Sequence, residues 1–180
     1  MSPDEACLRR KRICRTTVAA ANALYKAAAY GGRAAPQDDL YGIESSSQTF
    51  DLDNTEAHLE IVPELTPERL PKLLPELLCV ARVQTFGSTR LIRHVCTLPH
   101  ARQQGLASQL CAYLGEHIRA PLYLFPLPEL VALYQGAGFI QVSEHDLPDE
   151  LIDVWKQAKR STDNTQPMHY PNGELNEPFK

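Results

Sequence analysis

A short segment between an apolar run and an expected helix carries the residue types that an anion-binding loop needs. It reads TLPHARQQGLA from Thr97 to Ala107. The first turn of a helix has backbone N–H groups without an intrahelical acceptor, and the helix dipole favours negative charge there. Gly105 has no Cβ and therefore lets the backbone come close to a bulky group. The segment predicts a site for a phosphate-bearing ligand.

The elements that would position this loop follow from the periodicity of the apolar residues. Expected strands cover residues 12–17, 40–43, 77–86, 90–98, 121–125, 139–142 and 166–170. Expected helices cover residues 18–30, the segment from the loop to Ile118, the segment from Pro128 to Gly136 or Gly138, and residues 147–159. A turn at residues 87–89 makes a hairpin of the third and fourth strands. The order of elements predicts a mixed α/β sheet.

One domain is expected across residues 12–170, preceded by a basic N-terminal extension over residues 1–11 and followed by a disordered tail over 171–180. Residues 45–76 form an atypical insert, with a proline at every fourth position from Pro63 to Pro75. A long helix does not tolerate that spacing. The interleaved leucines favour packed turns, and a partner-binding proline segment is the alternative.

The composition is that of a soluble protein with one hydrophobic core. The 180 residues carry a net charge of −4, so nothing favours nucleic acid or an acidic membrane as a partner. No apolar stretch approaches the ~20 residues that span a bilayer. The five cysteines are odd in number and lack the paired spacing of metal ligands. This usage predicts reduced thiols, a cytoplasmic location and no structural metal.

Two motifs make the chain resemble the GNAT superfamily of N-acetyltransferases, which use acetyl-coenzyme A (acetyl-CoA). The family's cofactor loop reads Arg/Gln-x-x-Gly-x-Gly/Ala, often with a proline three residues earlier, and residues 102–107 with Pro99 fit it. A second family motif, Leu-Tyr-x-x-x-Gly-Phe, matches residues 133–139, and residues 23–26 give a softer match. The resemblance implies the GNAT acyl-CoA N-acyltransferase fold, an α/β fold whose central, mostly antiparallel sheet is flanked by helices.

The resemblance also implies a binding site for acetyl-CoA without a metal. The pyrophosphate would lie on N–H groups of the loop, and the pantetheine arm would pair with the strand before it. Arg102 would either pair with a phosphate or shape the loop. The implied cofactor-binding residues are Cys96, Thr97, Leu98, Arg102, Gln103, Gln104, Gly105, Leu106, Ala107 and Ser108.

Tyr134, in the second motif, is the implied acid that protonates the departing thiolate. A phenol has a reference pKa near 10, which lies close to that of a thiol. Tyr134 also shares one helix face with Leu127, Leu130 and Val131. A purely structural role in the core is therefore the alternative.

The general base that takes up the amine proton has several candidates. Many family members place a glutamate on the strand before the loop, where residues 91–94 of this chain read Leu-Ile-Arg-His. His94 suits proton uptake at neutral pH, although it would equally fill a half-buried strand position. Glu44 and Glu60 are remoter options. Cys96 could instead carry the acetyl group covalently, but a buried, inert thiol is the preferred interpretation.

These observations predict direct attack of an amine on acetyl-CoA. A strand N–H near Thr97 would polarise the thioester carbonyl. The acceptor, a small-molecule or peptide amine, is left open. Two alternatives stand beside this prediction: a GNAT-fold protein that binds CoA as a sensor without turnover, and an interaction module built on residues 45–76. The resemblance also allows a homodimer, which no residue demands.

Overall fold

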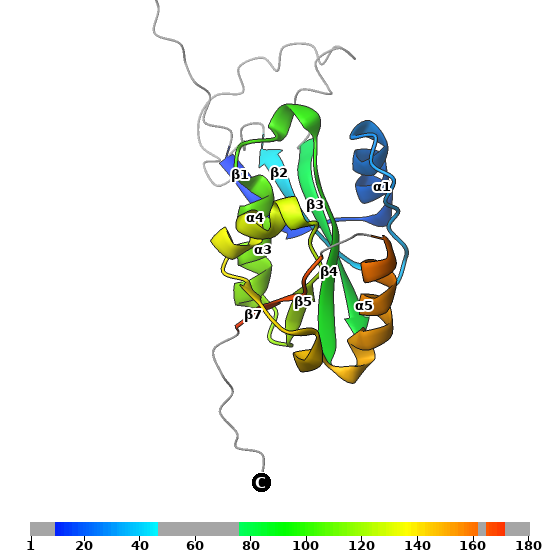
Figure 1. The fold of residues 1–180 in the computed structure, drawn as a ribbon. Helices are drawn as coiled ribbons and strands as arrows, with labels where there is room; N and C mark the ends of the chain where they lie inside the picture. Colours follow the sequence, from blue (N-terminus) through cyan, green and yellow to red (C-terminus); the bar gives the residue numbers. More distant parts are fainter. Residues whose placement is uncertain (1–9, 47–75, 162–164, 172–180) are drawn as a thin grey trace, which may run out of the picture.

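The computed structural model describes residues 10–46, 76–161 and 165–171 and arranges them around one sheet (Figure 1). Its strands are β1 (Arg10–Arg15), β2 (Asp39–Ser46), β3 (Glu76–Phe86), β4 (Thr89–Thr97), β5 (Leu122–Leu124), β6 (Ile140–Gln141) and β7 (Met168–Tyr170). Its helices are α1 (Val18–Ala27), α3 (Leu106–His117), α4 (Val131–Gly136) and α5 (Asp149–Ser161). In space the strands follow the order β1-β2-β3-β4-β5-β7-β6.

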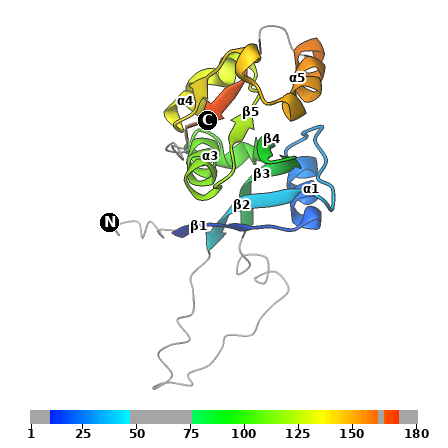
Figure 2. The same cartoon turned by 90° about the horizontal axis from the view of Figure 1, so that it is seen from below.

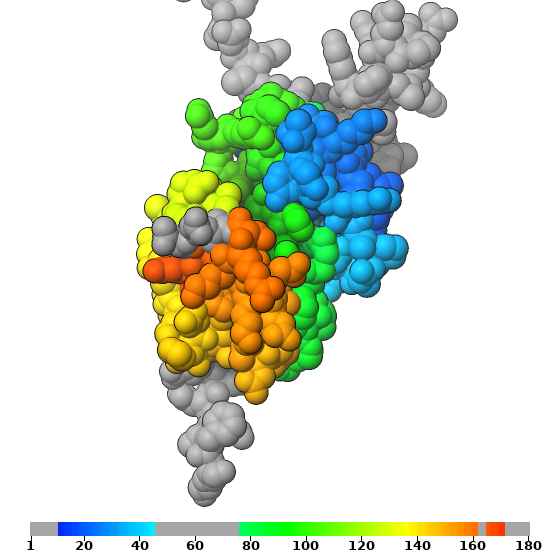
Figure 3. All heavy atoms as spheres, turned by 45° about the vertical axis from the view of Figure 1, so that its right-hand side comes forward, coloured from blue at the N-terminus to red at the C-terminus, as the bar shows by residue number. Residues whose placement is uncertain are grey.

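Helices cover both faces of this sheet. Figure 2 shows α3 and α4 on one face and α1 and α5 on the other. Helix α3 buries Leu106, Leu110 and Leu114, which recur at every fourth position and so form one apolar stripe. On the opposite face, Trp155 of α5 packs in a cluster with Leu91 of β4. Figure 3 shows α1 and α5 as separate ridges, with green atoms of the central strands between them.

Strand β4 loses its partner on one side before it ends. It pairs antiparallel with β3 as far as Thr97, but its parallel pairing with β5 covers only residues 90–92, opposite 122–124. The remaining part of β4, residues 93–97, therefore has a backbone edge that β5 does not cover. An extended ligand can use such an edge as an added strand would.

A β-bulge lies in this same part of β4. Cys96 is opposite Val80 and Arg93 is opposite Arg82, so two residues of β4 oppose Ala81 alone. His94 has a φ of +53°, the left-handed conformation that a bulge imposes on one residue. The bulge places Arg93 and Cys96 on the same face of the sheet, although three positions separate them.

The mixed α/β sheet with mostly antiparallel pairing confirms the fold class predicted from the sequence. The expected hairpin is present, with strand β3 turning into β4 at Gly87 and Ser88. Thr17 caps α1, because its hydroxyl accepts a hydrogen bond from the backbone N–H of Ala20 at 3.1 Å. Each expected strand and helix of the described residues has a counterpart close to its predicted place.

Three boundaries differ from the predictions. Strand β1 begins at Arg10, inside the segment predicted as a basic extension. The first helix ends at Ala27 and not at residue 30, because Ala29 takes a φ of +52° and the chain leaves the helical path there. Strands β2 and β3 extend to Ser46 and from Glu76, so both ends of the predicted insert belong to the sheet.

Residues 47–75 and 172–180 lie outside the described residues, and the predictions of packed turns and of a tail fall on them. No helix within the described parts of the chain has the length and apolar character that crossing a membrane requires.

Candidate active site

The loop between β4 and α3 combines two left-handed residues with a helix start. After a single turn of 3-10 helix at residues 99–101, Gln103 has a φ of +61° and Gly105 a φ of +72°. Gly105 is the N-cap of α3, so the N–H groups of the first helical turn follow it directly. A Cβ added at Gly105 would meet no atom within 4 Å. The glycine is therefore needed for its backbone conformation and for the open space in front of the helix.

Two polar side chains of the loop bind the protein itself. The Nε of Arg102 donates to the carbonyl oxygen of Thr97 at 3.2 Å, which ties the loop back to the end of β4. The side chain of Gln104 donates to the carbonyl of His100 at 3.4 Å and accepts from Lys11 at 3.1 Å. Of the two roles predicted for Arg102, the shaping of the loop is the one that this contact serves.

A cavity of about 430 Å³ opens between this loop, strand β4 and helix α4. That volume lies within the range of small-molecule sites. Leu98 and Gln104 of the predicted set do not line it, because Leu98 is buried in the core and Gln104 is bonded as described above. The eight predicted cofactor residues that line the cavity are Cys96, Thr97, Arg102, Gln103, Gly105, Leu106, Ala107 and Ser108.

Tyr134, the predicted acid, lines the same cavity from α4. Its side chain is 7% exposed, and its ring packs edge-on against Phe139 with 6.3 Å between the ring centroids. The second motif fixes this position: the N–H groups of Ala137 and Phe139 bond to the carbonyl of Tyr134, and Gly138 takes a φ of +93°. Burial raises the pKa of the Tyr134 phenol above its ordinary value.

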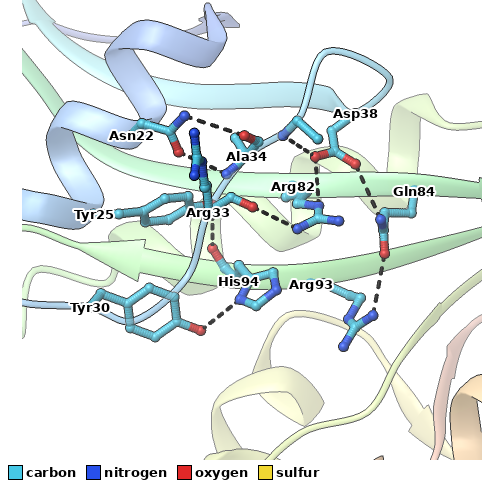
Figure 4. A network of polar contacts seen from close by, with 11 residues as sticks. Asn22, Tyr25, Tyr30, Arg33, Ala34, Asp38, Arg82, Gln84, Arg93 and His94 are labelled. Carbon is cyan, nitrogen blue, oxygen red and sulfur yellow. Dashed lines mark hydrogen bonds and ion pairs between the residues drawn. The ribbon is translucent and has the colours of Figure 1, made fainter. Parts of the chain in front are cut away.

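His94, the predicted base, does not line the cavity itself but contacts a tyrosine that does. The hydroxyl oxygen of Tyr30 lies 3.2 Å from Nδ1 of His94, and the hydroxyl of Tyr25 donates to the carbonyl of His94 at 3.0 Å (Figure 4). Burial, followed by the charges of Arg82 and Arg93, lowers the pKa of His94 below its ordinary value. His94 is thus a neutral imidazole at neutral pH, one side chain away from the cavity.

Tyr30 is a candidate functional residue that the sequence did not single out. The sequence placed it at the end of the first helix, whereas in the structure it follows α1 and lines the cavity. The signal that could have found it is the glycine pair after it, because Gly31-Gly32 ends the helix and leaves the preceding residues free to turn towards β4.

The sequence analysis also did not identify a polar network on the α1 and α5 side of β4. Nε of Arg82 lies 2.8 Å from a carboxylate oxygen of Asp38, whose side chain is 1% exposed. The amide of Gln84 donates to Asp38 at 3.2 Å and accepts from Arg93 at 3.4 Å, so Gln84 bridges the two residues (Figure 4). The alternation of residues along a strand predicts that Arg82 and Gln84 share one face of β3. It does not predict that Asp38, which precedes β2, contacts them.

The remaining base candidates lie elsewhere. No carboxylate is present among the described residues that line the cavity. Glu44 lies beside Cys14, where it adds to the effect of burial and raises the pKa of that thiol to about 11. Glu60 is outside the described residues. Cys96 lines the cavity, but burial raises the pKa of its thiol, with Arg102 opposing the shift, so it is a poor nucleophile at neutral pH.

Comparisons with known proteins relate the chain to others through its fold. No protein-family model and no curated protein matches its sequence. Among solved structures, the N-acetylglutamate synthase of Neisseria gonorrhoeae, in complex with coenzyme A and N-acetyl-glutamate, matches with a TM-score of 0.57 and 13% identity, over 89% of this chain and 34% of that one.

Two shorter proteins match over nearly their whole length. A Mycobacterium tuberculosis protein in complex with CoA has a TM-score of 0.55 and 11% identity, over 88% of this chain and 97% of that one. The ribosomal-protein-S18-alanine N-acetyltransferase of Escherichia coli has a TM-score of 0.50 and 13% identity, over 94% of this chain and 100% of that one.

These likenesses establish the fold. The chain spans about a third of the length of the Neisseria synthase, so the activity of that whole enzyme does not transfer to it. The architecture that all three share with this chain is the GNAT acyl-CoA N-acyltransferase fold, and the resemblance stated from the two sequence motifs is confirmed at that level.

Proposed function

We propose that this GNAT-fold chain is an N-acetyltransferase that moves the acetyl group of acetyl-CoA to an amine by direct attack. The observation that carries the proposal is that the Gly105 loop, the uncovered edge of β4 and the Tyr134 side chain all line the same cavity of about 430 Å³. These three features are the ones that a phosphate, an extended pantetheine arm and a departing thiolate require.

The residues of the cavity fit a CoA molecule. Gln103 and Gly105 both have left-handed backbone conformations, and the first turn of α3 adds N–H groups without an intrahelical acceptor. The open space in front of Gly105 leaves room for the pyrophosphate. The amides of the pantetheine arm would pair with backbone groups at the uncovered edge of β4 near Thr97, since the N–H of Leu98 is bonded to the carbonyl of Leu78.

Acetyl-CoA, when bound, supplies a thioester whose carbonyl carbon an amine can attack. The N–H of β4 near Thr97 would polarise that carbonyl. The hydroxyl of Tyr134 holds its proton throughout the neutral range, because burial raises the pKa of the phenol. Proton donation from so weak an acid becomes favourable when the same buried cavity also raises the pKa of the thiol that forms.

Tyr30 and His94 are proposed to remove the proton of the acceptor amine. A free amine has a pKa near 10.4 and is almost fully protonated at neutral pH. The Tyr30 hydroxyl can accept a proton from the cavity while it donates its own to Nδ1 of His94, 3.2 Å away. The lowered pKa of His94 favours the neutral imidazole, and Nδ1 accepts a proton in the tautomer that carries its hydrogen on Nε2.

Calorimetric titration of acetyl-CoA and of free CoA into the full chain tests the cofactor site, with Gly105→Glu as the variant. A carboxylate there would fill the open space and repel the pyrophosphate. Micromolar binding by the wild type that Gly105→Glu abolishes is expected. The control is Gly136→Glu, which adds the same charge at another position where a Cβ meets no atom within 4 Å.

A second candidate function is CoA binding without turnover, and the observation that favours it is the lack of a carboxylate among the described lining residues. An amine panel with thiol release as the readout separates the two functions. Turnover of any amine at a rate above hydrolysis supports the transferase. Tight CoA binding without thiol release from any amine supports the binding protein.

A further inference from the structure

Two arginines stand directly opposite each other on the central strands. Arg82 of β3 and Arg93 of β4 are cross-strand partners and so project from the same face of the sheet. Like charges in this arrangement destabilise a sheet unless a counter-charge is present. The two guanidinium groups carry two positive charges, and within the described residues the network contains one carboxylate, that of Asp38.

Asp38 is committed to Arg82. Its Oδ2 lies 2.8 Å from Nε of Arg82 and also accepts a hydrogen bond from the backbone N–H of Ala35 at 2.6 Å. Its Oδ1 accepts from Gln84. A second NH group of Arg82 donates to the carbonyl of Arg33 at 2.8 Å. Asp38 is therefore engaged with partners of its own, although Nε of Arg82 faces it as a charge contact without hydrogen-bond geometry.

Arg93 is held far more weakly. Its contact within the network is with the neutral amide of Gln84, at 3.4 Å. The group is only half-buried, and its guanidinium lies at the far end of the Gln84 bridge from Asp38 (Figure 4). Burial, and then the charge of Arg82, lower the pKa of Arg93, with Tyr30 and Asp38 acting in the other direction, so burial and Arg82 oppose its charge. An anion beside Arg93 would relieve that opposition.

Arg93 does not line the cavity itself, but its neighbours in the strand lead to residues that do. It precedes His94, whose ring contacts Tyr30 of the cavity wall, and the bulge turns Arg93 to the same face of the sheet as Cys96, another wall residue. Three strand positions separate Arg93 from Cys96, roughly 10 Å of backbone. The proposed cofactor loop leads into α3, which covers the other face of the sheet (Figure 2).

We propose that Arg93 binds a carboxylate of the acceptor, so that the acceptor is an amino carboxylic acid whose amine reaches the Tyr30 and Tyr134 end of the cavity. This inference rests on the proposed transferase function and assigns its substrate class. The guanidinium presents its N–H groups as a planar fork that matches a carboxylate. An acceptor with a second positive charge in place of the carboxylate is disfavoured by the same surplus of charge.

Matched pairs of amines test the assignment on the protein saturated with CoA. The probes are the common α-amino acids, β-alanine, γ-aminobutyrate and 4-aminobenzoate, each compared with its own carboxamide. Affinity is measured by calorimetry on the CoA complex, and acetylation by thiol release with acetyl-CoA. The variants are Arg93→Met and Arg93→Lys. The control is Arg90→Met, which removes the same charge from the same strand on its opposite face.

For at least one pair, the carboxylate is expected to bind and react better than its carboxamide by roughly tenfold to a hundredfold, the worth of a charge-assisted hydrogen bond. Arg93→Met brings that ratio close to one and leaves the affinity for CoA unchanged. Arg93→Lys keeps part of the preference, because it keeps the charge and loses the fork. Arg90→Met keeps all of it.

Three results would overturn the assignment: carboxamides that bind and react as well as carboxylates, a preference that survives Arg93→Met, or a CoA complex to which no member of the panel binds. In each of them CoA still binds, so the proposed cofactor site stands while the substrate class falls. Failure of CoA itself to bind the folded wild type removes the proposed function, and the assignment falls with it.

Discussion

The residues proposed to bind ligands on the two sides of strand β4 come from different parts of the chain. Towards α3 and α4, the features proposed to hold the cofactor are backbone N–H groups, a turn and a glycine, all within the contiguous residues 96–108, and Tyr134 of α4 adds a side chain. Towards α1 and α5, they are the side chains of Tyr30, Asp38, Arg82 and Arg93, which come from the α1–β2 connection and from two strands. One side is encoded locally and the other by tertiary structure.

This difference determines how each side responds to mutation. A backbone site depends on the conformations of a few residues, so the substitution that harms it most is one that fills space or changes φ, as at Gly105. A side-chain site depends on charge balance, so removing one partner leaves the other uncompensated. Variants on one side of β4 should therefore leave the properties of the other side intact.

The largest expected effect concerns turnover and belongs to the α4 side. Tyr134→Phe removes the hydroxyl and keeps the ring that packs against Phe139. Loss of a general acid lowers kcat by roughly 10²- to 10⁴-fold, with the CoA dissociation constant unchanged if CoA binds, as proposed, on the loop and on β4. Steady-state thiol release and calorimetry measure the two quantities.

Tyr113→Phe is the matched control, because this tyrosine on α3 stacks on His117 outside the cavity wall. If Tyr134→Phe keeps a wild-type kcat, Tyr134 is a core residue and the acid lies elsewhere. If it instead weakens CoA binding, the separation of binding from proton donation is wrong.

The next effect concerns stability and belongs to the α1 side. Asp38→Asn leaves the buried Arg82 guanidinium facing Arg93 without a counter-charge, which lowers the free energy of unfolding by about 3–5 kcal/mol. Asp39→Asn is the adjacent control, because its pair with Arg15 is exposed on both sides and is worth within about 1 kcal/mol. Urea unfolding of both variants measures the difference.

The comparison also predicts that folded Asp38→Asn binds CoA as the wild type does, since the cofactor loop shares no polar contact with Asp38 among the described residues. Equal stability losses in the two variants would mean that Asp38 is not the counter-charge that the sheet needs. Loss of CoA affinity would mean that the two sides of β4 are coupled.

What could be predicted from the sequence follows the same division. The loop and the Leu-Tyr-x-x-x-Gly-Phe motif were readable because turn chemistry is local: Gly105 and Gly138 mark positive φ values, and Pro99 marks the turn that ends β4. The apolar periodicity of α3 and of the hairpin strands placed these motifs correctly in the sheet.

The polar network towards α1 and α5 could not be predicted, because its contacts join residues that are distant in the sequence. Arg82 and Arg93 become partners through a two-residue turn at Gly87 and Ser88, where the sequence predicted a turn of three residues at 87–89, and a register that slips by one residue changes every cross-strand pair. Tyr30 reaches the cavity only because α1 ends early, at Ala27. The charge balance of the network appears only when the α1–β2 connection brings Asp38 to β3.

A smaller effect should appear in the titration of His94, where the two sides meet. Burial and the charges of Arg82 and Arg93 lower its pKa, so its imidazole resonances should titrate below the ordinary value of about 6.5. Because the unfolded chain binds this proton more readily, His94 contributes stability above pH 6.5 that is lost as the pH falls through its folded pKa. NMR titration measures it, with His94→Gln to assign the resonance.

Arg93→Met sharpens this measurement, because removing one of the two charges that act on His94 should move its pKa upwards. The acid limb of kcat/KM should move in the same direction if His94 is the proton acceptor. An acid limb that stays in place while the His94 resonance shifts would assign the base to another group.

The smallest expected effect is at Cys96, a thiol of the cavity wall on the same face of the sheet as Arg93. Direct attack by an amine needs no thiol, and burial raises the pKa of Cys96, so Cys96→Ala should keep kcat within about twofold of the wild type. The control is Cys79→Ala, since Cys79 is buried behind Thr97 and accepts a hydrogen bond from its hydroxyl at 3.2 Å. A loss of turnover at Cys96 alone, together with an acetylated protein in the intact mass spectrum, would show that the acetyl group passes through this thiol. The reaction would then proceed through an acetylated thiol, and direct attack of the amine on acetyl-CoA would be the wrong mechanism.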